Sequence, residues 1–441
     1  MFRSVILLGI MVLPINGGLS AEPVSRDQIE ERILQLEDEL QKLKAERAQL
    51  IRKEESGEFE NEAVNAVDTP SGPARVENGE WTVGGAIRAN YTIGDYPSGD
   101  RPSRGGHGGN FELDVFRLNV DYQKAALGGK MEYRFYDGYN FMHTLYGSYS
   151  FEDDSVLKVG LNRVPFGVGP YGPANSWFFD QHYYVGLADD MDYGVHYSKT
   201  VDSWTYDMAF YLSAENNWQG ASADSARYSY DIVDTGASNG HYQERGQINL
   251  RAVRSVEGSY PYKTGVSMQL GRLEGDGVFA DDTYAYAFAV HSEHSWNDWG
   301  LKAQVTYYNY NADYTGLDES NNDLILMGAY DYAAAVAGEA IIPSVAINYL
   351  WKPDQISWID SINFYNDFSI ILKQGTLDTG ESFNDSALNV LGMAIARGGW
   401  YVYVDLALSN GNYFVGDSGD FGANLGDDWQ KRFNINFGYY F

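Results

Sequence analysis

The feature that most constrains this chain is an alternation of apolar and polar side chains with a period of two, which runs from Trp81 to Phe441. Successive side chains of a β-strand point to opposite faces, so each alternating stretch predicts a strand with one apolar and one polar face. We therefore expect an all-β fold, a transmembrane antiparallel β-barrel of about 16 strands. The strands are predicted near residues 81–91, 111–122, 130–137, 142–151, 156–164, 191–199, 204–213, 242–255, 263–273, 283–294, 300–310, 339–351, 358–371, 387–397, 400–409 and 429–441.

The connections between these stretches alternate in length, as in barrels with short turns on the periplasmic side and long loops outside. The connections at 152–155 and 200–203 are short, whereas those at 165–190, 214–241 and 410–428 are long. Residues 311–338 are ambiguous: another strand pair there would make eighteen strands, and an inserted helix is also compatible. Tryptophans gather at or beside the expected short-turn ends, where they would form an aromatic girdle: Trp81, Trp204, Trp296, Trp299, Trp351, Trp358 and Trp400.

The N-terminus has the pattern of a secretory signal peptide. Arg3 precedes an apolar run from Val5 to Leu13, and a small-residue stretch ends at Ala21, so we expect residues 1–21 to be removed. The apolar run is shorter than the roughly 20 residues of a membrane-spanning helix. The absence of cysteine excludes disulfides and thiolate metal sites, and a net charge of −30 argues against a nucleic-acid partner.

Residues 26–55 carry a heptad pattern and are predicted to form a short α-helical coiled coil. Arg47 is a charged residue on one of the inner heptad positions. The apolar residues recur at alternating spacings of four and three: Ile29, Ile33, Leu36, Leu40, Leu43 and Leu50. The segment 32–37, RILQLE, is similar to a motif of parallel three-stranded coiled coils, so a homotrimer is expected. A single amphipathic helix lying on another surface is the alternative. Residues 56–80 lack a period and are the expected linker to the barrel, residues 81–441.

The chain ends in an alternating aromatic strand whose last residue is Phe441. This strand is similar to the signal read by the bacterial machinery that inserts outer-membrane barrels. We therefore expect location in the bacterial outer membrane, with the coiled coil in the periplasm. The expected partners are outer-membrane lipid, lipopolysaccharide and the insertion machinery, which would recognise Phe441.

The segment 157–167, LKVGLNRVPFG, resembles the strand and third-loop entry of the phosphate-selective porin O and P family. The N-terminal coiled coil agrees with this resemblance, as do residues 365–369 (YNDFS) and 404–405 (VD) in late strands. The resemblance covers essentially the whole mature chain, and its specific part is Pro165-Phe166-Gly167. It implies a trimeric sixteen-stranded porin, with anion selectivity in some members from a ladder of arginines and from constriction-zone lysines. Lysine is scarce here, so strong phosphate selectivity is not carried over.

Side-chain parity places six basic residues on the lumen face as candidate pore-lining groups: Arg88, Arg117, Arg134, Arg245, Arg251 and Lys302. Acidic Glu132, Asp367 and Asp405 are expected to point inward as well. These groups either pass anions along the lumen or brace the barrel through mutual ion pairs. A modest, phosphate-like anion preference follows from the first reading.

The connection at 165–190 is aromatic and stiffened by Gly and Pro, so it is long enough to fold into the barrel and narrow it. Its candidate constriction residues are Pro165, Phe166, Gly167, Tyr171 and Trp177. No catalytic constellation, metal site or cofactor is expected: the seven histidines form no recognisable pattern, and alternation sends His291 and His294 to opposite faces. Residues 417–428 are rich in Gly, Asp and Asn, which suits a polar exposed loop better than a calcium site.

These observations favour an outer-membrane porin, a water-filled channel for passive diffusion of small hydrophilic solutes and ions, and not an enzyme. The alternative is a structural tether, in which the coiled coil binds peptidoglycan or a surface layer and the barrel is only its membrane anchor.

Deleting residues 26–55 is expected to weaken trimer assembly while leaving each barrel folded, because backbone pairing closes a barrel independently of the coiled coil. Gel migration of boiled and unboiled detergent samples measures both properties: heat-modified mobility reports the barrel, and band size reports assembly. An unchanged trimer, or loss of the folded barrel, would contradict the assignment of the assembly role to this segment.

Overall fold

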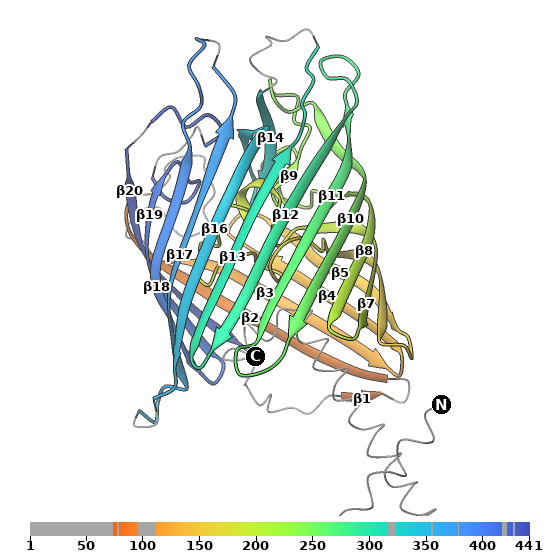
Figure 1. Cartoon of the computed structure of the whole chain (residues 1–441), viewed down its shortest axis with the longest axis vertical. Helices are drawn as coiled ribbons and strands as arrows, with labels where there is room; N and C mark the ends of the chain where they lie inside the picture. The colour runs from red at the N-terminus through yellow and green to blue at the C-terminus, as the bar shows by residue number, and fades with distance from the viewer. Residues whose placement is uncertain are drawn as a thin grey trace, which may run out of the picture. The chain divides into compact units, whose positions relative to one another are not determined.

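The computed structural model describes residues 74–76, 79–95, 111–315, 323–353, 356–377, 379–416, 421–426 and 428–441, all within the second of two compact units, Lys53–Phe441. These residues form a barrel of tilted strands (Figure 1), and its wall has sixteen of them within this described part. The wall strands are β2 (Gly79–Gly94), β3 (Phe111–Lys124), β4 (Leu127–Phe135), β5 (Asn140–Ser150), β6 (Ser155–Arg163), β7 (Met191–Val201), β8 (Trp204–Ala214), β10 (Tyr242–Val256), β11 (Tyr262–Gly275), β12 (Thr283–Trp296), β13 (Trp299–Asn309), β16 (Glu339–Trp351), β17 (Ser361–Gln374), β18 (Ser386–Arg397), β19 (Trp400–Asn410) and β20 (Gln430–Tyr440). The prediction of a sixteen-stranded antiparallel barrel is confirmed.

The wall closes where its first and last strands meet. β2 pairs with β3 on one side and with β20 on the other, so that Ile87 lies opposite both Phe116 and Tyr439. Closure lets each wall strand share backbone hydrogen bonds with two neighbours. That arrangement satisfies the backbone inside a bilayer, where lipid tails offer no hydrogen-bonding partner.

The two ends of the barrel differ in their connections. Turns of two residues at 125–126, 202–203, 297–298 and 398–399 lie at one end, which we call the short-turn end. The connections at 164–190, 215–241, 310–338 and 411–429 lie at the opposite, long-loop end. The expected alternation of short and long connections is confirmed.

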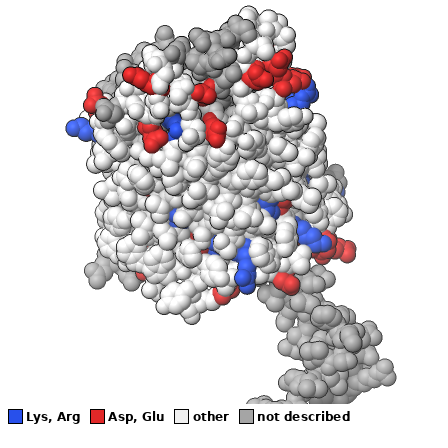
Figure 2. Space-filling model, turned by 45° about the horizontal axis from the view of Figure 1, so that its top comes forward, with Lys and Arg blue, Asp and Glu red and all other residues white. Residues whose placement is uncertain are grey.

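The outer face of the wall is apolar. On β10, Ile248 and Leu250 are 44% and 38% exposed. Asn249 between them and Gln247 before Ile248 are buried. Figure 2 shows the result on one face: charged side chains gather toward the two ends, and the band between them is nearly free of charge. Six of the seven tryptophans expected near the short-turn end are exposed there: Trp81, Trp204, Trp299, Trp351, Trp358 and Trp400. No helix in the described part of the chain is long and apolar enough to cross a membrane.

Within 311–338, the described residues 311–315 and 323–338 add no strand to the wall. They contain the hairpin β14 (Leu324–Ala329) and β15 (Tyr332–Ala337), which pairs with the short strand β9 (Asp231–Ile232) in a separate three-stranded sheet. The hairpin turn is Tyr330-Asp331, and both residues have positive φ, 50° and 62°, as a type I′ turn requires. The eighteen-stranded alternative is therefore wrong for the residues described, and so is an inserted helix at 323–338.

The predicted domain boundaries fall partly outside the described residues. The signal peptide 1–21 and the coiled coil 26–55 lie there entirely. The linker 56–80 lies there except for β1 (Ala74–Val76), which pairs with β2, and for Gly79 and Glu80 at the start of β2. The barrel thus begins slightly before the predicted boundary at Trp81.

Phe441 lies beside the seam of the barrel. Its backbone N–H donates to the carbonyl oxygen of Gly85 at 3.0 Å, and its carbonyl oxygen accepts from the Gly85 N–H at 2.8 Å, while its side chain remains 43% exposed. The ring is thus presented outward, whereas the main chain makes the contacts that close the seam.

Phe441→Ala is expected to reduce the outer-membrane yield several-fold while leaving export intact, because it removes the exposed terminal ring and keeps both main-chain hydrogen bonds. Phe437→Ala is the matched control, since Phe437 lies on the same strand and is exposed to a similar degree, 38%. Membrane fractionation and heat-modified mobility measure the outcome. Equal yields of the two variants would refute recognition of Phe441 by the insertion machinery.

Candidate pore and its inner loop

The connection between β6 and β7, residues 164–190, folds into the barrel, and we call it the inner loop. Its first part contacts one side of the wall: the Gly167 N–H donates to Ser267 Oγ on β11 at 3.0 Å, and the Val168 N–H donates to Gln304 Oε1 on β13 at 2.8 Å. Gly167 has φ 70°, in the left-handed region, and a Cβ there would meet the Gln304 amide at 2.4 Å. Glycine at 167 thus allows the loop to turn closely against the wall.

The middle of the inner loop is fastened to two carboxylates. Asp367 on β17 accepts hydrogen bonds from Asn175 N, Asn175 Nδ2 and Ser176 N at 2.8, 2.9 and 2.8 Å. Asp405 on β19 accepts one from Trp177 N at 3.4 Å and one from Tyr365 Oη at 2.6 Å. Both acids point inward as predicted, and both are used in holding the loop.

A third contact is made by Asp180 and His182, which are fully buried. His182 Nδ1 lies 2.5 Å from Asp180 Oδ2, and its Nε2 lies 2.8 Å from Thr306 Oγ1 on β13. Ser344 Oγ on β16 donates to the same Asp180 oxygen at 2.8 Å. These bonds add a second contact to β13 and join the inner loop to one more strand, β16.

All five candidate constriction residues lie on this loop. Phe166 and Trp177 are 6% and 3% exposed, and Pro165 and Gly167 are also buried. Trp177 Nε1 donates to Asp114 Oδ2 at 3.3 Å, and the Arg163 guanidinium lies 5.4 Å from the centre of the Tyr171 ring.

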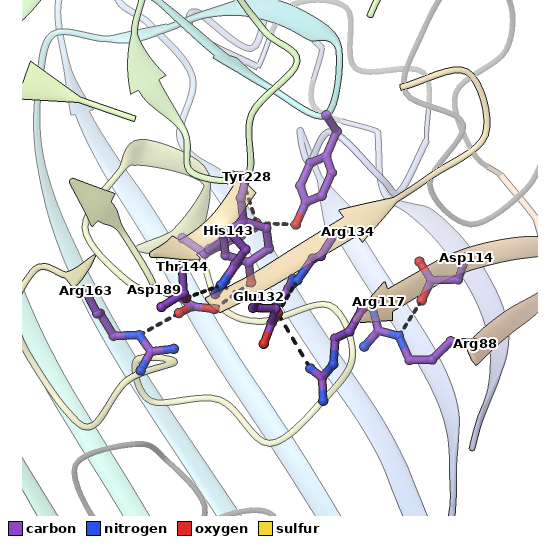
Figure 3. A network of polar contacts seen from close by, with 12 residues as sticks. Arg88, Asp114, Arg117, Glu132, Arg134, His143, Thr144, Arg163, Asp189 and Tyr228 are labelled. Carbon is purple, nitrogen blue, oxygen red and sulfur yellow. Dashed lines mark hydrogen bonds and ion pairs between the residues drawn. The ribbon is translucent and has the colours of Figure 1, made fainter. Parts of the chain in front are cut away.

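Arg88, Arg117 and Arg134 face the lumen from adjacent strands, where they meet two acids (Figure 3). Arg88 Nε lies 3.0 Å from Asp114 Oδ2, while Arg134 Nη2 and Arg117 Nη1 lie 2.6 and 3.9 Å from Glu132 Oε1. Their side chains are 14%, 24% and 10% exposed in the order Arg88, Arg117, Arg134. Arg117 therefore has the most exposed side chain of the three and the longest ion pair.

The predicted residues on the opposite side of the barrel also point inward, where they contact the inner loop. Arg251 Nε donates to the carbonyl oxygen of Gly167 at 3.0 Å, and its Nη1 lies 3.1 Å from Asp207 Oδ2. Lys302 Nζ donates to the carbonyl oxygen of Ala174 at 3.4 Å and is 8% exposed as a residue. Their contacts match the bracing role that was the alternative to an anion ladder.

Arg245 departs from the predicted parity and lies on the outer face. A β-bulge shifts the register between Arg245 and Ile248, and Gly246 within it has φ 64°. The extra residue reverses the side-chain alternation, so Arg245 lies opposite Arg272 and pairs with Glu274 at 3.1 Å, both about half exposed. The prediction that Arg245 lines the lumen is wrong for this reason.

Sequence reasoning missed two buried cations that hold loops inside the barrel. Arg432 on β20 donates to the carbonyl oxygen of Phe414 at 2.9 Å, and its guanidinium lies 5.4 Å from the centre of the Trp177 ring. Lys373 Nζ donates to Ser386 Oγ at 2.7 Å and also to the carbonyl oxygen of Phe421. Parity could have identified Arg432, because it precedes Asn434 and Asn436 on the inward face of the last strand.

Rings from four connections pack together between the inner loop and the other long segments. Tyr183 of the inner loop meets Tyr230 edge-on at 5.5 Å, and Tyr230 stacks on Tyr413 at 5.4 Å. Tyr330, in the hairpin turn, contacts Phe414 at 6.1 Å. All five rings are nearly or fully buried, so the long connections share one aromatic core inside the barrel.

A group of buried acids lies where the inner loop enters β7. Oxygen atoms of Asp190, Asp192 and Asp231 all lie within 4.8 Å of one another. Burial raises the pKa of the Asp190 carboxyl, and the negative charges of Asp192 and Asp231 raise it further. Burial raises the pKa of Asp231 to about 6, against the opposing effect of Arg227. Asp190 and Asp192 are neighbours in the sequence, whereas Asp231 comes from a later connection, so sequence analysis did not bring the three together.

No protein-family model and no curated protein sequence matches this chain. Among solved structures, the outer membrane channel DcaP of Acinetobacter baumannii is similar over 84% of this chain and 100% of that one, with a TM-score of 0.54 and 10% identity. OmpT, an outer membrane protein of Vibrio cholerae, matches with a TM-score of 0.49 and 16% identity, over 84% of this chain and 100% of its own. An anion-selective porin from Comamonas acidovorans matches with a TM-score of 0.49 and 11% identity, over 82% of this chain and 100% of that one. The likeness to DcaP shows that this chain has the fold of an outer-membrane channel.

Asp367→Ala is expected to loosen the inner loop, because it leaves three hydrogen-bond donors without their acceptor, at a cost of about 2 kcal/mol or more. Single-channel recording should show a larger mean conductance and more current fluctuation than the wild type. Asp360→Ala is the control: Asp360 binds Arg397 and the Gly398 N–H in a turn at the short-turn end, away from the loop. Unchanged currents in Asp367→Ala would show that the loop position does not depend on this carboxylate.

Proposed function

We propose that this protein is an outer-membrane channel through which small hydrophilic solutes diffuse passively into the periplasm. The observation that carries the proposal is a closed wall with an apolar outer face and a polar inner face, crossed by a loop that is hydrogen-bonded to β3, β10, β11, β13, β16, β17 and β19. Such a loop limits the size of the solutes that can pass. It does so from a fixed position and not by hinged closure of the barrel. The fold shared with DcaP, an outer membrane channel, supports the same function.

A modest preference for small anions, of the phosphate-like kind, follows from the charges on the inner wall. Arg88, Arg117 and Arg134 oppose Asp114 and Glu132, which gives this group of five a formal charge of +1. The chain as a whole carries −30, but exposed charges are screened beyond about 8 Å at physiological ionic strength. Charges inside the barrel lie beside the permeating ion, so they weigh more on selectivity than the acidic exterior.

The proposed assembly is a homotrimer held by the coiled coil of residues 26–55 on the periplasmic side. The start of β2 supports this orientation, since Glu80 pairs with Gln123 next to the short turn 125–126. Short turns face the periplasm in barrels of this kind. Outer-membrane lipid and lipopolysaccharide would then surround the apolar band.

Arg117→Gln is expected to move the reversal potential in a salt gradient toward cations. A unit charge about 8 Å from an ion in water contributes about 0.5 kcal/mol, so its loss should lower the anion-to-cation permeability ratio about twofold. Planar-bilayer recording of the purified protein measures this ratio. Arg245→Gln is the matched control, because Arg245 lies on the outer face beside Glu274 and its loss should leave the ratio unchanged.

Equal shifts in the two variants, or a wild-type preference for cations, would refute the anion preference. A folded trimer that conducts no ions would refute the channel itself, and would favour a barrel that only anchors the coiled coil.

A further inference from the structure

Three buried aspartates from separate segments converge on one point at the edge of the aromatic core. Asp190 ends the inner loop, Asp192 belongs to the wall strand β7, and Asp231 belongs to the inner strand β9. They are 5%, 1% and 1% exposed, and one carboxylate oxygen of each lies within 4.8 Å of those of the other two. Together they link the inner loop, the wall and the inner sheet.

Two further acids adjoin these aspartates, and their own hydrogen bonds are only partly satisfied. Glu215 Oε1 accepts from Tyr228 N at 2.7 Å and also from Ser229 N, and Glu244 Oε1 accepts from Ile232 N at 3.0 Å. Both glutamates raise the negative potential at Asp190 and Asp192.

The positive charge at this point is small. Arg227 Nη1 lies 3.0 Å from Asp231 Oδ2, but its Nη2 lies 2.6 Å from Asp224, so its charge is divided between two acids. With Asp224, six carboxyl groups therefore lie around Arg227, and Arg245 is a second positive charge that acts on Glu244. Buried carboxylates are stable only when they are paired, protonated or bound to a metal.

Several oxygen atoms of the group lack a hydrogen-bond donor. Within the described residues, Asp190 Oδ1, Asp192 Oδ1 and Glu215 Oε2 are buried and accept no hydrogen bond. Asp192 Oδ2, by contrast, accepts one from Gln247 Nε2 at 3.3 Å. The atoms without donors belong to two of the three converging aspartates and to the glutamate beside them, which is the arrangement expected of ligands whose partner is an ion.

We propose that Asp190, Asp192 and Asp231 form a buried binding site for a divalent cation of the calcium type. The donors are all carboxylate oxygens, which hard cations prefer, and neither histidine nor sulfur belongs to the group. The three oxygens all lie within 4.8 Å of one another, close enough for one ion to be shared among them. Mg²⁺ usually keeps several of its waters and binds through one or two carboxylates, whereas Ca²⁺ accepts larger sets of protein oxygens, so a buried group of three carboxylates favours Ca²⁺.

The cation acts as a clamp. It neutralises acids from two segments that are distant in the sequence, residues 190–192 at the start of β7 and Asp231 in β9, so it favours the position in which the inner sheet lies against β7. The competing explanation is that the same carboxyl groups share protons and bind no metal.

Calcium binding to the purified full-length protein in detergent, after removal of divalent ions with chelator, tests the site at pH 8. Isothermal titration with CaCl₂ is expected to show one high-affinity site per chain. Asp192→Asn and Asp231→Asn should each weaken it tenfold or more, because each removes a charged ligand. Asp281→Asn is the matched control: Asp281 is an exposed carboxylate in a connection at the same end of the barrel, and its loss should not change the affinity.

The unfolding temperature distinguishes a calcium-bound clamp from carboxyl groups that only hold the fold together. Ca²⁺ should raise the unfolding temperature of the wild type and of Asp281→Asn, but not that of the two site variants. The site variants should fold without calcium, since an amide relieves the same repulsion. Absence of a saturable site in the wild type, or equal affinity in all four proteins, would overturn the proposal and leave shared protons as the explanation. Preference for Mg²⁺ over Ca²⁺ would overturn the assignment of the ion.

Discussion

The structure depends on one constraint: a backbone inside a bilayer must find all its hydrogen-bonding partners within the protein. The seam between β2 and β20 meets that constraint by making the sheet continuous. Once the sheet is closed, the pleat of each strand divides its side chains between lipid and lumen. The apolar band outside and the polar rows inside are therefore two consequences of the same pairing.

The same constraint acts inside the barrel. The inner loop has little regular secondary structure of its own, so its backbone N–H groups need acceptors from the wall. The acceptors are inward side chains of three wall strands: Ser267 on β11, Gln304 on β13, and Asp367 and Ser369 on β17. Polar residues that would solvate an open channel are used here to hold a buried segment. Lys302 and Arg251 belong to this group as well, since both donate to carbonyl oxygens of the loop.

The wall could be predicted from the sequence because its signal is repeated and local. Parity alone placed Arg88, Asp367 and Asp405 on the correct face, and the same rule would have placed Arg432 there. It failed at Arg245, where one inserted residue at Gly246 reverses the alternation and leaves no mark in the apolar pattern. It could not separate the hairpin at 324–337 from a pair of wall strands, because both are short alternating stretches and only their partners differ.

The acidic group at Asp190 could not be predicted from local sequence patterns, for a further reason. Asp190 and Asp192 are close in the sequence, but Asp231 belongs to a two-residue strand in another connection, and only the folded chain brings it beside them.

The fastening of the inner loop to Asp367 and Asp405 also affects the charge inside the barrel. Both acids point toward the lumen, and both direct their oxygens at loop N–H groups. In this position the loop shields two negative charges from a passing ion as well as occupying space. A channel that lost the loop by deletion would be wider, and it would also expose these carboxylates. The arginines on β2, β3 and β4 would then have exposed carboxylates a few strands away, since the wall runs from β17 through β18, β19 and β20 to β2. The position of one segment thus affects both the free width inside the barrel and the charge of its inner surface.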